Sequence, residues 1–267
     1  MSGDNIDSQE FQLSDENYEL FRAYFGDDDR EAIFQHVSEI REKALKVFRF
    51  YIVQKFKLLR MKTHPFYPSL LDLNKKRKDL KVLDLGCCFG ADLRKLIIDG
   101  FPGNNLVGLD ISSEFIELGY DLFKDRDGPM KFIVADILSE EWSDKVADLE
   151  FDVIYLGSFL HLFTREEQDK ILSRVCQLLK PNGVLFGRNL GSTSMDAPSF
   201  HSEHLDKDMF LPTADMFTKS LSDLGFGDVD VTAVSKDQLE DFQGGNDAMP
   251  GRPFLIYTAV KNADSKN

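Results

Sequence analysis

The sequence predicts an α/β fold in which a mostly parallel sheet carries helices on both faces. A short apolar run at 81–85 leads into a glycine-bounded turn at 86–90 and then into a helix-like segment at 91–99. Strand, tight turn and helix in this order are how a nucleotide-binding α/β domain begins. From Asp79 onward, short apolar strands alternate with helical patterns, which is typical of a parallel sheet covered on both sides.

The alternation places the expected elements along the chain. Strands are expected at 81–85, 106–110, 131–134, 151–157 and 183–188, with two more near 228–234 and at 254–260. Helices are expected at 91–99, 113–123 and 165–179, and near 214–224, the third closed by the stop signal Lys180-Pro181-Asn182-Gly183. Because the last two of the seven strands are close in sequence, they predict an antiparallel edge of the sheet.

Residues 1–78 are expected to form an acidic tail and a helical cap in front of a sheet domain at 79–267. Residues 1–40 hold eleven acidic and two basic residues, and the first dozen are expected to be disordered. From Arg30 to Lys62 apolar residues recur at helical spacing, and the run Asp27-Asp28-Asp29 is placed to cap this helix.

The segment 41–78 has the opposite charge, with twelve basic and two acidic residues among interleaved aromatic residues. Such a pattern suits an RNA-binding arm. It also suits amphipathic cap helices with a solvated basic face. The second interpretation is favoured, because the acidic first forty residues can partly neutralise the segment.

The composition narrows the classes of partner. A formal net charge of -14 disfavours a chain-wide nucleic-acid surface. No apolar run approaches the roughly 20 residues of a membrane span. The three cysteines, Cys87, Cys88 and Cys176, are an odd number with two adjacent, so a reducing, cytoplasmic location is expected. His201 and His204 have a metal-compatible spacing but no evident third ligand, so no metal is expected.

Acidic residues stand at the ends of three successive predicted strands, namely Asp84, Asp110 and Asp136. Ligands of such sheets bind beyond the carboxyl ends of the strands. Asp110, which follows Asp84 by 26 residues, is placed to accept hydrogen bonds from both hydroxyls of a ribose. A lone acid at a strand end is more often a helix cap, but three in succession after a glycine turn indicate a nucleoside site.

The turn itself argues against a dinucleotide. It reads Gly86-x-Cys88-x-Gly90 and contains no basic residue, so it lacks both the G-x-G-x-x-G fingerprint and the lysine of a P-loop. A nucleoside without phosphates that carries a sulfonium and an ammonium group suits an acid-lined pocket. S-adenosyl-L-methionine has that description.

These motifs resemble the ordered motifs of class I S-adenosylmethionine-dependent methyltransferases. The stretches that carry the resemblance are 82–90, Gly108-Leu109-Asp110, Ala135-Asp136-Ile137 and 178–183. The resemblance covers about 80–190 strongly and implies a Rossmann-like, seven-stranded methyltransferase sheet, here with an N-terminal helical cap. More narrowly, 40–44, 64–68, 86–90 and 115–123 are similar to fungal secondary-metabolite methyltransferases, including meroterpenoid carboxyl methyltransferases. That similarity implies methyl-ester formation and a homodimer.

The resemblance also implies cofactor-binding roles, at Asp84, Gly86, Cys87, Cys88, Gly90, Asp110, Ile111, Asp136, Ile137, Leu156 and Gly157. Asp84 is expected near the amino group of the methionine portion, and Asp110 at the ribose with Ile111 beside the adenine. Asp136 and the backbone amide of Ile137 are expected to contact the adenine. Cys88 stands where the general class commonly has a third glycine.

Tyr155, His161 and Arg188 are the expected catalytic residues, since 155–161 is implied to flank the transferred methyl group. A carboxylate acceptor is already charged and needs no base, whereas a phenol with a pKa of about 10 benefits from one. His161 is the candidate base, or a packing residue. Arg188 is placed to anchor a substrate carboxylate, or to pair with a nearby acid.

The function expected is O-methylation of a small, apolar, carboxylic or phenolic natural-product intermediate, with a methyl ester as the favoured product. Two alternatives stay open: an RNA methyltransferase that uses 41–78, and a cyclase scaffold that binds S-adenosylmethionine without transferring methyl. The long connection 189–212 is expected to act as a lid over the substrate.

Overall fold

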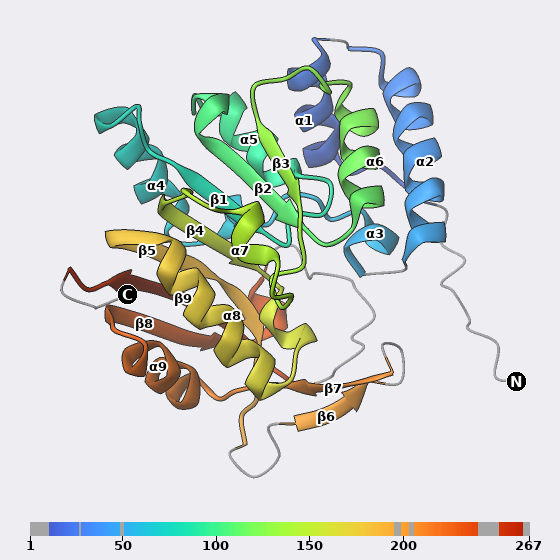
Figure 1. Ribbon diagram of the computed structural model, residues 1–267. Coiled ribbons are helices and arrows are strands. Elements are labelled where there is room, and N and C mark those ends of the chain that lie inside the picture. Colours follow the sequence, from blue (N-terminus) through green and yellow to red (C-terminus); the bar gives the residue numbers. More distant parts are fainter. Residues whose placement is uncertain are drawn as a thin grey trace, which may run out of the picture.

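The structure is a computed structural model that describes residues 11–26, 28–48, 51–194, 199–202, 206–239 and 251–263. A seven-stranded sheet lies at its centre, in the order β3-β2-β1-β4-β5-β9-β8 (Figure 1). Its strands are β1 (Val82–Leu85), β2 (Leu106–Asp110), β3 (Lys131–Val134), β4 (Phe151–Gly157), β5 (Leu179–Leu190), β8 (Phe226–Val234) and β9 (Phe254–Lys261). The predicted seven-stranded, Rossmann-like architecture is confirmed.

The first five strands of the sheet are parallel, and β9 pairs antiparallel with both β5 and β8. The antiparallel edge predicted from the spacing of the last two strands is therefore confirmed. The chain fills one half of the sheet with β1 to β3 and then returns to place β4 on the other side of β1. This reversal between β1 and β4 opens a crevice at their carboxyl ends, where ligands of such sheets bind.

Helices cover both faces of the sheet, namely α5 (Ala91–Ile98), α6 (Ser113–Phe123), α7 (Trp142–Lys145), α8 (Arg165–Leu178) and α9 (Ala214–Asp223). Successive residues of β1 point to opposite faces, so Leu83 packs in the cluster under α8 and α9 while Val82 packs against α5. Every residue of β1 is buried, as expected for a strand covered on both sides.

The strand β5 begins four residues earlier than predicted, directly after α8. Its register against β4 shifts between the pairs Phe151–Leu179 and Val153–Val184, so residues 180–183 bulge out of the ladder. Asn182 takes a left-handed conformation there, with φ of 62°. The helix α8 ends at Leu178, just before the predicted stop signal at 180–183. The strand β5 begins at the next residue, so the stop signal lies within the strand.

The N-terminal region forms α1 (Asp15–Phe25), α2 (Arg30–Val47), α3 (Tyr51–Lys55), the short 3₁₀ turn η1 (Met61–Thr63) and α4 (Tyr67–Lys76). The predicted helical pattern from Arg30 to Lys62 is too long. The helix α2 ends at Val47, because the backbone is extended at Phe48. Asp29 does cap α2, through its carboxylate and the N–H groups of Glu31 and Ala32. Of the segment expected to be disordered, residues 1–10 lie outside the described ranges. The boundary between 78 and 79 stays a prediction.

An aromatic cluster joins the cap to the sheet domain. The rings of Phe21 and Phe123 lie 5.3 Å apart between centroids, and those of Phe56 and Phe89 lie 5.9 Å apart. Phe89 belongs to the glycine turn, and Phe123 ends α6, which lies beside α1 and α2 (Figure 1). Much of the phenylalanine content therefore builds the contact that places the cap over the turn.

Several basic residues of 41–78 are paired within the chain. Lys62 pairs with Glu16, and the guanidinium of Arg77 bonds the carboxylates of Asp79 and Asp152 at 3.3 and 2.9 Å. Lys75 pairs with Asp72 on the same helix, at 2.8 Å. These contacts favour the interpretation of this segment as a cap with a solvated face.

His64 ties the cap to β5. Its Nδ1 accepts the N–H of Phe66 at 3.1 Å, so the proton is on Nε2, which donates to the carbonyl of Gly187 at 3.0 Å. The ring is buried and packs edge-on against Phe186. Burial lowers the pKa of His64 to about 4.

This pKa predicts an acid-dependent loss of stability. The unfolded chain, with an ordinary histidine pKa of about 6.5, binds more protons than the native state between pH 4 and 6.5. The stability that neutral His64 contributes to the folded protein is fully present above pH 6.5, and it is lost as the pH falls to about 4. As the pH falls through that window, the free energy of unfolding of the wild type should decrease relative to that of His64→Gln. The expected decrease is up to about 1 kcal/mol per pH unit. Urea unfolding of both proteins at several pH values measures this change in the free energy of unfolding. A difference between the two proteins that does not depend on pH would contradict the prediction.

The predicted long connection at 189–212 is partly structured. It contains an antiparallel pair, β6 (Ser199–Ser202) and β7 (Lys207–Phe210), which stands apart from the main sheet (Figure 1). The Phe210 N–H donates to the carbonyl of Phe163, next to the 3₁₀ turn η3 (Leu160–Leu162). His204 lies outside the described ranges, and the role of this segment as a lid stays a prediction.

No helix in the described ranges combines the length and the apolar character needed to cross a membrane. Within the same ranges, no three histidine, cysteine or acidic side chains cluster in a way that could hold a metal ion.

Candidate active site

The turn after β1 is tied to the neighbouring strand β2. The N–H groups of Gly86 and Cys87 both donate to the carbonyl of Leu109, at 2.8 and 3.1 Å. Gly86 has a φ of +78°, and a Cβ atom there would lie 2.5 Å from the ring of Phe159. Glycine is therefore required at this position both by conformation and by space.

Cys88 adopts the conformation of the glycine that it replaces in the general class. Its φ is +50°, in the left-handed region, which costs a residue with a side chain about 1–2 kcal/mol. Its N–H donates to Asp110 Oδ2 at 2.8 Å, and this bond holds the strained turn against the end of β2. Burial raises the pKa of both thiols, Cys87 and Cys88, so they stay neutral and serve packing.

Asp110 has capacity left for a ligand. Its Oδ1 accepts the Ser112 N–H at 3.0 Å and its Oδ2 accepts the Cys88 N–H, while a carboxylate offers about four acceptor sites. Burial raises the pKa of Asp110, and backbone N–H groups partly offset that rise. The carboxylate thus fixes the turn and can still accept the two hydroxyls of a ribose.

A pocket at the carboxyl ends of β1 and β4 brings predicted site residues together. It is lined by the predicted residues Asp84, Gly86, Cys87, Cys88, Tyr155 and Gly157, and by the unpredicted residues Leu58, Arg60, Phe89, Ala91 and Asp92. Burial, and then the charges of Asp92 and Asp110, raise the pKa of Asp84 well above its usual value. A cationic ligand group beside Asp84 would relieve both effects.

The hydroxyl of Tyr155 is a buried polar atom in the lining of this pocket. Tyr155 is 2% exposed, and its hydroxyl has no hydrogen-bond partner among the described residues. It lies 2.6 Å from where a Cβ atom on Gly157 would stand. An unsatisfied buried hydroxyl costs about 1–3 kcal/mol, so it indicates a ligand atom at this place. Together with the buried acids and the glycine cradle, it makes the pocket fit S-adenosylmethionine.

The residues predicted to contact the adenine lie directly after the strands β2 and β3. Ile111 is 67% exposed directly after Asp110, where an apolar side chain suits a flat base. Asp136 accepts the Leu138 N–H at 2.8 Å. The side chains of Ile137 and Leu156 lie in the core, so only their backbone groups can face a ligand. The Leu156 carbonyl already accepts the Tyr257 hydroxyl, at 3.2 Å.

Two pocket residues, Arg60 and Asp92, escaped the sequence analysis. The Asp92 Oδ1 accepts the N–H groups of Arg60 and Met61, at 3.0 and 2.9 Å. Burial raises the pKa of Asp92 to about 6. The contact joins residues 32 apart, and no local pattern marks it. The one sign of this contact is that the charged residue Asp92, in the first turn of α5, is buried.

His161 lies in the 3₁₀ turn η3 after β4 and is not among the residues that line this pocket. It is held by Asn189, which the sequence analysis also missed. Asn189 Oδ1 accepts the His161 backbone N–H at 2.7 Å, and the same oxygen lies 3.0 Å from His161 Nδ1. Because the backbone N–H is always a donor, it fixes the amide oxygen toward His161, and Nδ1 must carry the ring proton. Nε2 is then the acceptor nitrogen. Burial lowers the pKa of His161 to about 4, so the ring is neutral near pH 7.

Arg188 is buried at the end of β5, on the same side of the sheet as Tyr155. It is 2% exposed, its Nε donates to Ser158 Oγ at 3.3 Å, and its guanidinium lies 5.6 Å from the centroid of the Phe254 ring. Arg60, Arg188 and Lys236 all lower the pKa of His161 further.

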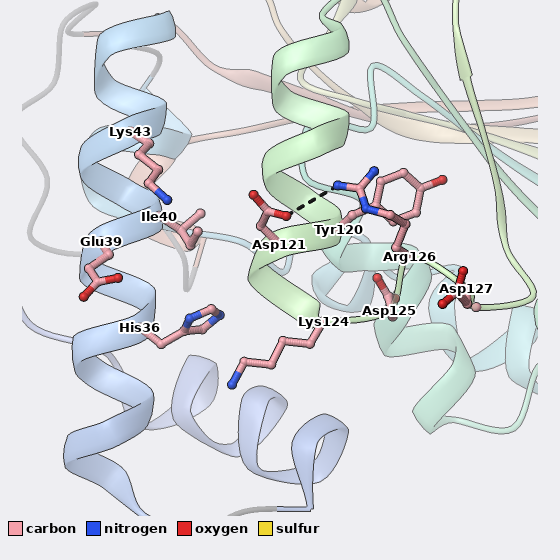
Figure 2. A pocket seen from close by; sticks show the side chains of 11 residues that line it. His36, Glu39, Ile40, Lys43, Tyr120, Asp121, Lys124, Asp125, Arg126 and Asp127 are labelled. Atoms are coloured by element: carbon pink, nitrogen blue, oxygen red, sulfur yellow. Dashed lines mark hydrogen bonds and ion pairs between the residues drawn. The ribbon is translucent and has the colours of Figure 1, made fainter.

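A second hollow lies away from the strand ends, between α2 and α6 (Figure 2). Its lining mixes acids such as Glu39 and Asp127 with bases such as Lys43 and Lys124. None of the predicted site residues lines it, and the mixed charges select no ligand class.

Comparisons with known proteins point to methyltransferases. The family described as "methyltransferase domain" matches residues 82–183. O-methyltransferase atr3 of Stereocaulon alpinum is 41% identical over 173 residues, which are 61% of this chain and 50% of that protein. Methyltransferase adrK of Penicillium roqueforti is 42% identical over 156 residues, 57% of this chain and 55% of that protein.

A solved structure shows the same fold at low sequence identity. The cyclase SpnF has a TM-score of 0.52 and 20% identity, covering 73% of this chain and 82% of that one. The matches to atr3 and adrK span about half the length of those relatives. The family match contains the turn after β1, Asp110 and Asp136, which the strand ends place around one crevice. Residues 82–183 therefore match the methyltransferase-domain family, and the chain has the Rossmann-like fold of class I methyltransferases.

Proposed function

We propose that this chain methylates an oxygen atom of a small, apolar natural-product intermediate, and that this oxygen belongs to a carboxylate. The observation that carries the proposal is the acid-lined pocket at the ends of β1 and β4, together with a second region that holds His161 after β4 and the buried Arg188 at the end of β5. Relatives such as atr3 and phiE bear the name O-methyltransferase, and further matched relatives named methyltransferase come from Penicillium and Aspergillus species. The product would be a methyl ester.

The residues of the first region would hold the cofactor. Asp84 would meet the ammonium group, Asp110 the ribose, and Asp136 with the Ile137 backbone the adenine. Bound S-adenosylmethionine supplies a methyl group activated by a positive sulfonium. The protein's contribution is alignment, because an in-line displacement depends mainly on the distance and angle between donor and acceptor.

The residues of the second region favour an anionic acceptor. Arg188 offers a bidentate partner for a carboxylate, and its charge is one of those that lower the pKa of His161. A carboxylate held there needs no proton removed before it attacks. His161 would then orient the acceptor rather than act as a base.

Replacing His161 tests the acceptor type. With a carboxylate acceptor, we expect His161→Ala to keep kcat within about tenfold of the wild type, since no proton transfer is lost. The assay is radiolabel transfer from S-adenosylmethionine to a panel of acidic and phenolic aromatic compounds. Loss of more than about a thousandfold would contradict the carboxylate and indicate a hydroxyl acceptor that depends on a base.

A hydroxyl acceptor is the second candidate, and one observation favours it. Asn189 holds His161 with Nε2 as a proton acceptor, which is the arrangement of a general base. Its pKa of about 4 lies far below that of a phenol, which limits its strength as a base. The product distinguishes the candidates, because alkaline hydrolysis cleaves a methyl ester and leaves a methyl ether intact.

The remaining alternatives have separate readouts. Steep salt dependence of RNA binding would favour an RNA methyltransferase that uses 41–78. Turnover of a substrate without formation of S-adenosylhomocysteine would favour a cyclase scaffold. The proposed homodimer, implied by the narrower resemblance, is checked by light scattering of the purified protein.

A further inference from the structure

The loop that follows β3 is held from outside by two basic residues of α8. Arg174 Nη1 donates to the carbonyl of Ile137, and the same nitrogen donates to the carbonyl of Ser139 at 2.7 Å. One helical turn earlier, Lys170 Nζ donates to the carbonyl of Leu138 at 3.0 Å. The carbonyls of three consecutive loop residues thus accept hydrogen bonds from two cations, and such bonds are stronger than those between neutral groups.

The same loop is organised from within by Asp136 and Ser139. Asp136 Oδ1 accepts the N–H of Leu138 at 2.8 Å, and the Asp136 carbonyl accepts the N–H and the hydroxyl of Ser139 at 3.1 and 3.0 Å. In a planar trans peptide unit, the C=O of one residue and the N–H of the next point in opposite directions. The bonds to the Asp136 carbonyl therefore fix the direction of the Ile137 N–H.

Arg174 is the better shielded of the two cations. Its side chain is 12% exposed, against 41% for that of Lys170. Its guanidinium lies 5.4 Å from the centroid of the Trp142 ring, and Trp142 is 5% exposed in α7, directly after the loop. Hydrogen bonds shielded from water contribute more than exposed ion pairs, such as those of both cations with the 87% exposed Glu140. Arg174 is therefore the main anchor of the loop.

We propose that Arg174, with Lys170 as a weaker second contact, is a positioning residue that sets the selectivity of this chain for an adenine base. The inference rests on the proposed contacts of Asp136 and the Ile137 N–H with the adenine of the cofactor. A carboxylate and an N–H suit the edge of adenine that presents the 6-amino group as donor and N1 as acceptor. Arg174 holds the two peptide units that carry these groups.

Two ligands that differ only in the base test this role. S-adenosylhomocysteine carries adenine, whereas S-inosylhomocysteine carries hypoxanthine, which presents an acceptor at position 6 and a donor at N1. Because both groups are reversed, the wild type should bind S-adenosylhomocysteine at least about a hundredfold more tightly in titration calorimetry. In Arg174→Leu, this ratio of affinities should fall at least about tenfold through weaker binding of S-adenosylhomocysteine. The affinity for S-inosylhomocysteine should change less than about threefold, because that ligand gains little from the loop.

Three further variants calibrate the effect. Arg174→Lys keeps a cation that can donate to one of the two carbonyls but lacks the planar fork, so it should recover part of the ratio. Lys170→Ala should lower the ratio less than Arg174→Leu does, because Lys170 is more exposed. Arg165→Leu is the matched control on the same helix, since the Arg165 guanidinium lies 5.5 Å from the centroid of the Phe210 ring instead. It should leave the ratio unchanged.

The single tryptophan of the sequence, Trp142, gives a readout that needs no ligand. Acrylamide quenching of its fluorescence should increase in Arg174→Leu, because the ring and the loop lose the guanidinium that joins them. The increase should be smaller in Arg174→Lys. Unchanged quenching in Arg174→Leu would mean that the loop keeps its place without Arg174, and it would overturn the inference.

The outcomes separate this inference from the proposed function. If the wild type binds neither ligand, the proposed function fails and the inference falls with it. If the wild type binds both ligands equally, use of the cofactor stands, but this loop does not select the base and the inference is overturned.

A loss of affinity in Arg174→Leu that is equal for both ligands means that Arg174 only supports the pocket as a whole, which also overturns the inference. The same holds if Arg165→Leu lowers the ratio as much as Arg174→Leu does. Thermal melting reveals whether Arg174→Leu folds. If it does not fold, Arg174→Lys and Lys170→Ala carry the test, and an unchanged ratio in both overturns the inference.

Discussion

Asp110→Ala should raise the dissociation constant of S-adenosylhomocysteine about a hundredfold or more. The variant loses the carboxylate proposed to accept two ribose hydroxyls, and each hydrogen bond to a charged group contributes about 1.5–3 kcal/mol. It also frees the Cys88 N–H, which Asp110 Oδ2 holds at 2.8 Å in the left-handed turn. Titration calorimetry measures the loss. An unchanged affinity would refute the assignment of this pocket to the cofactor.

Two control variants separate the two contributions of Asp110. Asp72→Ala removes an exposed carboxylate on α4 that pairs with Lys75 and does not line the pocket, and it should leave the affinity unchanged. Adding Cys88→Gly to Asp110→Ala relaxes the turn, since glycine adopts a positive φ without strain. If the double variant recovers the affinity, the lost turn was the cause. If it does not, the ribose contact was the cause, as we expect.

The parts of the fold that follow local rules could be predicted from the sequence. The bounds expected for 106–110, 131–134 and 151–157 agree with β2, β3 and β4, because apolar runs between turn signals mark buried strands well. The helix α1 was missed because acidic residues surround the two residues that face the cap core, Leu20 and Phe21. The helix α4 lies in the segment 41–78, where cap helices were expected without bounds, and Pro68 stands in its first turn, where proline is tolerated.

The candidate site divides in the same way. Asp84, Gly86, Asp110 and Asp136 stand at strand ends, and strand order alone brings such ends to one crevice. Arg60 and Asn189 reach the site through tertiary contacts, with Asp92 in one case and His161 in the other. No period or motif in the sequence encodes those contacts. Arg60 and Asn189 were therefore less predictable than the acidic residues and the glycine at the strand ends.

Arg94→Ala should lower the free energy of unfolding by about 3–5 kcal/mol, the usual cost of removing one partner of a buried ion pair. The Arg94 side chain is 1% exposed and bonds both oxygens of Asp125, at 2.8 and 2.7 Å. Its Nη1 donates to the carbonyl of Phe89, and the Tyr24 hydroxyl donates to Asp125 at 2.7 Å. One guanidinium thus joins α5 to the glycine turn, the end of α6 and, through Asp125, the cap.

Urea unfolding measures this effect, and an exposed pair gives the control. Arg126→Ala breaks a surface contact with Glu117 and should leave the unfolding midpoint essentially unchanged. A loss below about 1 kcal/mol for Arg94→Ala would contradict the role of Arg94 as a junction. Because Arg94 supports the turn through Phe89, saturating S-adenosylhomocysteine should restore part of the lost stability, by mass action on the native state. The restored part should shrink when Asp110→Ala is added, since the ligand then binds the native state less tightly.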